Sequence, residues 1–179
     1  MENHYIVGMP DRASSDWLLN CSRRLGNLFS NSEYELIEPH FTLTHINGPI
    51  ADSEALLDGL GDVVRDLEAF LVYCRRFFYF KGASSGKNGI GFMIIKTDIL
   101  MNVVNRLEAY ISNLGISAVY VPQWIPHLSL IRELSVREID RQTKRRIRAE
   151  IKTIPIKISG LRLTGKEAEG IRIIREWSL

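Results

Sequence analysis

One short pattern occurs twice in this chain, and it constrains the fold more than any other feature. Pro39–Leu43 reads Pro-His-Phe-Thr-Leu, and Pro126–Leu130 reads Pro-His-Leu-Ser-Leu. Apolar and polar residues alternate in both copies, which is typical of a β-strand with one face in a core. Each copy is therefore expected to place its histidine and its hydroxyl residue together on one face of a strand.

The sequence around the two copies predicts an α+β protein. The further strands expected from aromatic and β-branched runs are 4–9, 71–80, 89–96, 154–163 and 170–176. The helices expected from apolar spacing are 16–29, 53–70, 98–114 and one that begins near Ser135. Ser53 and Asp98 are candidate N-caps, and Gly115 is placed to end the third helix.

Similar elements precede and follow each copy, so the halves of the chain predict two β-α lobes. No low-complexity linker separates these halves, and 179 residues are enough for one domain with a substantial core. We therefore expect residues 1–179 to form a single bilobal, pseudo-symmetric domain. Antiparallel sheets should flank a central cleft to which each lobe contributes one histidine.

Composition narrows the functional classes. A net charge of +2 is too small to identify a nucleic-acid-binding protein by charge alone. Cys21 and Cys74 lie in no CxxC pattern, so we expect buried free thiols rather than a disulfide framework or a zinc ribbon. The first residues include an acid and have neither a basic region nor a long apolar stretch, so we expect no secretory signal, no membrane span and a cytoplasmic location. Oligomeric state is left open.

Two such strands side by side would bring two imidazoles and two hydroxyls together. Imidazoles can transfer protons near neutral pH, and hydroxyl donors can hold phosphate oxygens, which suits the hydrolysis of a phosphodiester. A single His-x-Thr or His-x-Ser triplet arises often by chance, but the pair in matching contexts does not. Trp124, just before the second copy, could form a base-stacking face or belong to the core.

Strict alternation separates the remaining candidates. Thr44 should share the face of His40 and line the cleft floor, whereas His45 should point away from the site. His4 is expected at the surface. The histidines have no HxH or HxxxH spacing, and no acids cluster near the motifs, so neither a metal nor another cofactor is expected. Among the aromatic residues 77–80, one member could reach the cleft.

The paired His-x-Thr/Ser motifs resemble those of the two-histidine (2H) phosphoesterase superfamily, and 124–134 is most similar to its small cyclic phosphodiesterases. The resemblance implies that His40 and His127 form the general acid/base pair. It also implies that Thr42 and Ser129 hold phosphate oxygens and that Trp124 flanks the substrate.

The expected activity is metal-independent hydrolysis of 2′,3′-cyclic phosphates on nucleotides or RNA ends, with recognition centred on one ribose phosphate and its base. Two alternatives remain at this point. The same histidines could serve a 2′-5′ phosphodiesterase or 2′-5′ RNA ligase. The chain could also be a non-catalytic RNA- or nucleotide-binding module, although a pure binder has no need of two acid/base groups.

Overall fold

The computed structural model describes residues 3–29, 34–47, 54–81, 87–118, 125–135, 139–149, 154–167 and 170–179. Its helices are α1 (Arg12–Asn27), α2 (Glu54–Arg65), α3 (Asp98–Asn113) and α4 (Arg141–Ala149). Its strands are β1 (Asn3–Pro10), β2 (Glu35–Leu36), β3 (Phe41–Asn47), β4 (Phe70–Lys81), β5 (Asn88–Ile94), β6 (Ser117–Ala118), β7 (His127–Leu134), β8 (Ile154–Glu167) and β9 (Gly170–Ser178). The predicted α+β class is confirmed.

Within the described ranges, all nine strands belong to one curved antiparallel sheet. Their hydrogen-bonded order is β2-β7-β5-β4-β8-β1-β3-β6, and β9 pairs with β8. β3 and β7, which are each next to last in this order, also pair with each other and so bring the two ends of the sheet together. The lobes are thus parts of one continuous sheet rather than two separate sheets.

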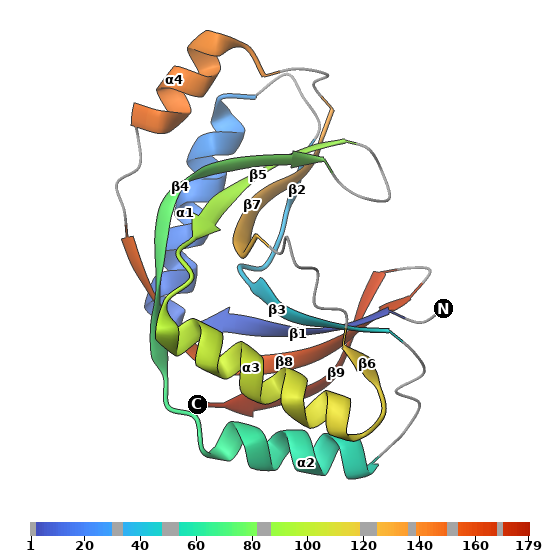
Figure 1. Cartoon of the computed structure of the whole chain (residues 1–179). Coiled ribbons are helices and arrows are strands. Elements are labelled where there is room, and N and C mark those ends of the chain that lie inside the picture. Colours follow the sequence, from blue (N-terminus) through green and yellow to red (C-terminus); the bar gives the residue numbers. More distant parts are fainter. Residues whose placement is uncertain are drawn as a thin grey trace.

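Figure 1 shows the two lobes. We call one the β3 lobe, which contains β6, β3, β1, β8 and β9, with α2 and α3 over it. The other is the β7 lobe, which contains β2, β7, β5 and the outer part of β4, with α1 and α4. The long strand β4 joins the lobes, because 70–74 pairs with β8 and 74–81 pairs with β5.

The lobes do not correspond to the two halves of the chain. α1 follows β1 of the β3 lobe but packs mainly against β7 of the other lobe. α3 follows β5 of the β7 lobe but packs against α2, β3 and β6. Each lobe therefore draws on both halves of the sequence, and the expectation that each half forms its own lobe is corrected in this respect.

Side chains at the helix starts explain most of the differences from the predicted bounds. α1 begins earlier than predicted because the Asp11 carboxylate accepts a hydrogen bond at 2.8 Å from an amide of the first turn. The N-cap of α3 is Thr97 rather than Asp98, since the Thr97 hydroxyl accepts a first-turn amide at 3.3 Å. Gly115 follows this helix with a φ of 72°, as its predicted role requires.

α2 and α4 also differ from their predicted bounds. α4 begins only at Arg141, because Asp140 accepts an amide hydrogen bond at 2.8 Å and caps the helix there. α2 ends at Arg65, and Phe70 already belongs to β4. The predicted cap Ser53 lies outside the described residues. No helix in the described part of the chain is long and apolar enough to cross a membrane.

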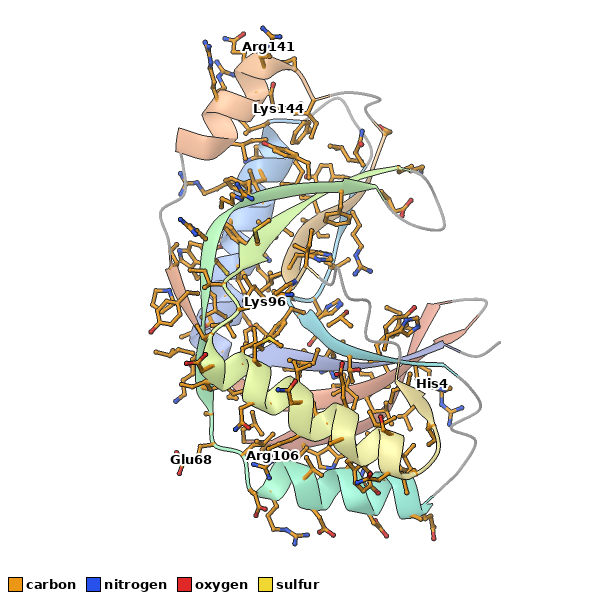
Figure 2. The ribbon with its side chains drawn as sticks, viewed as in Figure 1. His4, Glu68, Lys96, Arg106, Arg141 and Lys144 are labelled. Atoms are coloured by element: carbon orange, nitrogen blue, oxygen red, sulfur yellow. The ribbon has the colours of Figure 1, made fainter. Side chains whose placement is uncertain are left out.

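The core lies between the sheet and the helices, and both Cys21 and Cys74 are buried in it as free thiols, as predicted. Arg106 of α3 donates hydrogen bonds to the Val63 carbonyl and the Asp66 carboxylate, which ties α3 to the end of α2 (Figure 2). The expectation that His4 lies at the surface is wrong, because this side chain is only 7% exposed.

Candidate active site

The two sequence motifs meet where β3 pairs with β7. Phe41 lies opposite Leu128 in this antiparallel pairing. When the register is continued by one residue in each direction, each histidine lies beside the hydroxyl residue of the other motif. The fold therefore brings together the four motif residues singled out by the sequence, which are His40, Thr42, His127 and Ser129.

Main-chain carbonyls orient both imidazoles in the same way. His40 Nδ1 lies 2.7 Å from the Glu38 carbonyl oxygen, and His127 Nδ1 lies 2.9 Å from that of Ile125. A carbonyl oxygen can only accept, so Nδ1 must be the donor in each bond. In the neutral form, Nε2 of each ring therefore keeps its lone pair and is the atom able to take up a proton.

The proline of each motif explains this repeated geometry. Pro39 and Pro126 separate each histidine from the residue that supplies the carbonyl, and Pro126 is buried. Proline restricts the residue before it to an extended conformation. This local restriction favours the placement of the preceding carbonyl beside the imidazole in both motifs.

Both histidines favour their neutral form. Burial is the main reason that the pKa of His40 and the pKa of His127 lie below the ordinary value of 6.5. The carbonyl hydrogen bonds oppose this effect in part. The positive charge of Arg132 lowers the pKa of both rings further, so this one guanidinium acts electrostatically on both halves of the site.

Strict alternation along β7 would place Arg132 away from His127, so the sequence pattern alone does not single out Arg132 as a site residue. In β7, Ser129 lies opposite Gly91 and Ile131 lies opposite Ile90, so Leu130 is an extra residue. Such a β-bulge reverses the alternation beyond it. Arg132 therefore returns to the face that carries His127 and Ser129.

β3 contains the same irregularity, and it corrects two predictions. Thr42 lies opposite Val7 and Thr44 lies opposite Ile6, so Leu43 is an extra residue. Thr44 consequently turns to the helix-covered face, where it is buried and its hydroxyl lies 3.5 Å from a carboxylate oxygen of α3. It does not share the face of Thr42.

His45 is turned the other way by the same bulge. It lies opposite Tyr5, and Tyr5 shares a face of β1 with Val7, the partner of Thr42. His45 therefore lies on the Thr42 face, contrary to the prediction that it points away. A β-bulge next to a functional site is a common way to redirect a side chain.

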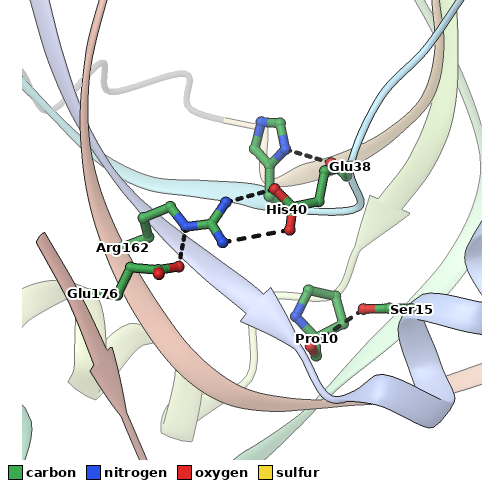
Figure 3. A network of polar contacts seen from close by, with 6 residues as sticks. All are labelled: Pro10, Ser15, Glu38, His40, Arg162 and Glu176. Atoms are coloured by element: carbon green, nitrogen blue, oxygen red, sulfur yellow. Dashed lines mark hydrogen bonds and ion pairs between the residues drawn. The ribbon is translucent and has the colours of Figure 1, made fainter. Parts of the chain in front are cut away.

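Two further side chains support the histidines. The Phe80 ring lies 5.1 Å from the His127 ring at an angle of 46°, so at least this member of the aromatic run 77–80 contacts a motif residue. On the other side, Arg162 of β8 makes two hydrogen bonds to the Glu38 carboxylate, at 2.5 and 3.4 Å (Figure 3). The same guanidinium donates to Glu176 of β9 at 2.5 Å.

The ion pairs that Arg162 makes with Glu38 and Glu176 hold Glu38 in place, and the carbonyl of Glu38 accepts the hydrogen bond from His40. The Arg162 side chain is only 14% exposed and lies between two carboxylates. Such two-point pairing restricts geometry more than a single contact does. Glu38 is thereby held to β8 by its side chain while its carbonyl accepts from His40, as Figure 3 shows. Ile125 supplies the corresponding carbonyl to His127, and its uncharged side chain cannot form ion pairs of this kind.

The proposed phosphate-binding hydroxyls differ in exposure. Thr42 is half-buried, whereas Ser129 is only 4% exposed. Trp124, the predicted stacking residue, lies outside the described residues. In the ranges that the structure describes, no three His, Cys, Asp or Glu side chains come together in a group that could hold a metal ion.

The bilobal α+β fold, with the two histidine motifs at the junction of its lobes, is shared by several solved structures and agrees with the fold that the resemblance to the two-histidine phosphoesterases predicted. The structure is similar to TT0787 of Thermus thermophilus, with a TM-score of 0.67 and 13% identity over 99% of this chain and 97% of that chain. It is also similar to E. coli LigT complexed with 3′-AMP, with a TM-score of 0.60 and 12% identity over 99% and 98% of the two chains.

A third similar structure is the MHV ns2 PDE domain, with a TM-score of 0.63 and 13% identity over 92% of this chain and 99% of that chain. No family model matches the sequence, and no curated protein matches it. At these identities the structural similarity shows the fold, and the chemistry must be argued from the site itself.

Arg132→Met should raise the pKa of both His40 and His127, because it removes a positive charge that disfavours both imidazolium forms. Arg132→Lys keeps the charge and serves as the control. Titration of the two imidazole Cε1 protons by NMR measures both values in each variant. A rise at only one histidine would contradict the shared action of Arg132.

Arg162→Gln should affect His40 alone, since only its carbonyl partner is held by this arginine. The loss of a nearby cation and the exposure of the Glu38 charge both act to raise the pKa of His40. The same NMR titration should show His127 unchanged. Arg175→Gln is the matched control, because Arg175 lies opposite Leu163 on the other face of the sheet. Equal shifts at both histidines would count against a local role.

Proposed function

We propose that this protein is a metal-independent phosphodiesterase that hydrolyses 2′,3′-cyclic phosphates of nucleotides or RNA ends. The observation that carries the proposal is the matched orientation of two imidazoles at one strand pair. Each has Nδ1 bonded to a carbonyl, so that in the neutral ring Nε2 is the atom that can take up a proton. Two such groups meet the need of phosphodiester hydrolysis for one base and one acid.

In the proposed reaction, neutral Nε2 of one histidine removes a proton from water as the water oxygen forms a bond to phosphorus. The other histidine, protonated on Nε2, donates its proton to the departing ribose oxygen as that P–O bond breaks. Thr42, Ser129 and Arg132 would stabilise the negative charge that accumulates on the phosphate oxygens. Which histidine acts as base depends on how the substrate is oriented.

The structural comparisons support a phosphate-directed activity. LigT has been crystallised with 3′-AMP, a nucleoside monophosphate, and the ns2 domain is described as a PDE domain. We therefore propose a nucleotide or RNA-end ligand for this chain, with Trp124 beside it. The two buried free thiols agree with the proposed cytoplasmic location, where thiols stay reduced.

The substrate class is tested by comparing kcat/KM on nucleoside 2′,3′-cyclic phosphates and on 2′-5′-linked oligoadenylate at one salt concentration. Preference for the cyclic phosphates supports the proposal. Cleavage of the 2′-5′ linkage alone would favour the 2′-5′ phosphodiesterase or ligase alternative. RNA binding without turnover of either substrate would favour a binding module.

His40→Ala and His127→Ala should each lower kcat by at least about a hundredfold, because each removes one proton-transfer partner. Thr42→Ala and Ser129→Ala should lower kcat/KM by about 5- to 150-fold, the effect of losing a hydrogen bond to a charged oxygen. Steady-state kinetics measure these effects, and circular dichroism checks folding. Near-normal turnover by a folded His40→Ala protein would contradict the assignment.

The pH profile of kcat/KM should be bell-shaped, with its maximum below pH 6.5. Above both histidine pKa values no imidazolium remains to act as acid, and below both no neutral base remains. Since burial and Arg132 lower both pKa values, the whole bell moves to the acid side. Activity should persist in EDTA. Loss of activity in EDTA with recovery on adding zinc or manganese would indicate a metallohydrolase.

A further inference from the structure

Two rows of side chains cross the face of the β3 lobe that carries the first motif. The first row, from β3 to β9, consists of Thr42, Val7, Arg162 and Glu176. The second row, over the same strands, consists of His45, Tyr5, Thr164 and Ile173. The rows are two residues apart along β1 and β8, which is about 7 Å. This separation is comparable to one nucleotide of an extended strand.

The second row faces the same side of the sheet as the proposed catalytic groups. Arg162 in the first row reaches Glu38, so the segment leading to His40 passes over this face. Tyr5 and Thr164 lie two positions further along regular stretches of β1 and β8. The second row therefore continues the surface on which the first motif is placed.

The pseudo-symmetry of the two motifs gives an independent reason to connect His45 with the site. His45 follows His40 by the same number of residues as Arg132 follows His127. In both strands one extra residue, Leu43 or Leu130, restores the later side chain to the motif face. Arg132 acts on both imidazoles, and His45 occupies the corresponding position in the other lobe.

The chemistry of the second row suits a flat, uncharged group. The rings of Tyr5 and His45 are stacked, with centroids 4.6 Å apart and planes 5° apart. Among the described residues, Nε2 of His45 has no hydrogen-bond partner, and burial lowers the pKa of this ring. Ile173 at the far end of the row is 50% exposed. The row thus consists of neutral side chains, half-buried at Tyr5 and His45 and exposed at Ile173, beside the charged first row.

We propose that the second row is a subsite for the nucleoside on the 5′ side of the terminal cyclic phosphate, whose base packs on Tyr5 and His45. This inference rests on the proposed function and narrows its substrate class to RNA ends of two or more nucleotides. Stacking on aromatic side chains tolerates any base, because every base has a π-face. The subsite adds a second base contact to the single one that the sequence predicts.

The test compares kcat/KM for a dinucleotide ending in a 2′,3′-cyclic phosphate with kcat/KM for the corresponding mononucleotide. The native protein should prefer the dinucleotide by at least about fivefold, as expected for one stacked base. Tyr5→Leu with His45→Leu should bring this ratio close to one. Tyr73→Leu, which changes an exposed tyrosine on β4, is the matched control and should leave the ratio unchanged.

A second variant covers the case in which the double leucine protein fails to fold. Ile173→Glu changes an exposed side chain and places a negative charge at the end of the second row, which repels the additional phosphate of the dinucleotide, so the ratio should again fall. Ile99→Glu on α3 is its control, since Ile99 is exposed to a similar extent, at 59%. A native ratio near one, or a ratio that none of the second-row variants changes, would overturn the subsite.

Binding separates a failure of this inference from a failure of the proposed function. If the native protein hydrolyses neither substrate, the proposed function fails. Calorimetry with 3′-phosphorylated dinucleotide and mononucleotide then tests whether the subsite exists. The native protein should bind the dinucleotide at least about fivefold more tightly, and the protein with Tyr5→Leu and His45→Leu should lose this difference. If Ile173→Glu instead dissociates a dimer and leaves dinucleotide binding intact, the surface binds a second copy and the subsite is rejected.

Discussion

The pairing of β3 with β7 is the constraint on which the candidate site depends. It brings together two motifs that are distant in sequence, and it rests on one opposed pair of residues, Phe41 and Leu128. The long strand β4 holds this junction in place, because it pairs with β5 in the β7 lobe and with β8 in the β3 lobe. The positions of the two imidazoles relative to each other are therefore a property of the whole sheet rather than of either lobe.

The sequence predicted the α+β class, the two motif strands and the free thiols because these depend on local patterns. It failed where one extra residue changed the phase of a strand. Leu43 and Leu130 are ordinary apolar residues, and neither bulged strand has a glycine or proline at its bulge. Alternation therefore assigned Thr44 to the site and excluded His45, and it gave no reason to select Arg132. A bulge depends on the partner strand, which the local pattern does not show.

The local sequence pattern also did not predict the ion pairs between residues that are far apart in the chain. Glu38, Arg162 and Glu176 belong to a loop and two strands, and no spacing rule connects them. Their interaction makes the two halves of the site unequal despite the repeated motif. His40 is supported through an ionic network on β8 and β9, whereas His127 packs against an aromatic ring of β4. Pseudo-symmetry in the motifs thus coexists with different means of holding each ring.

The carbonyl bonds to Nδ1 have a consequence for how such a chain can vary. Every amino acid has a main-chain carbonyl, so the residue two positions before each histidine can orient the ring whatever its side chain is. Glutamate holds this position in one motif and isoleucine in the other. Mutation at these positions is thus free to change the surroundings of each imidazole while its tautomer is preserved, and the recognisable pattern in the sequence begins only at the proline.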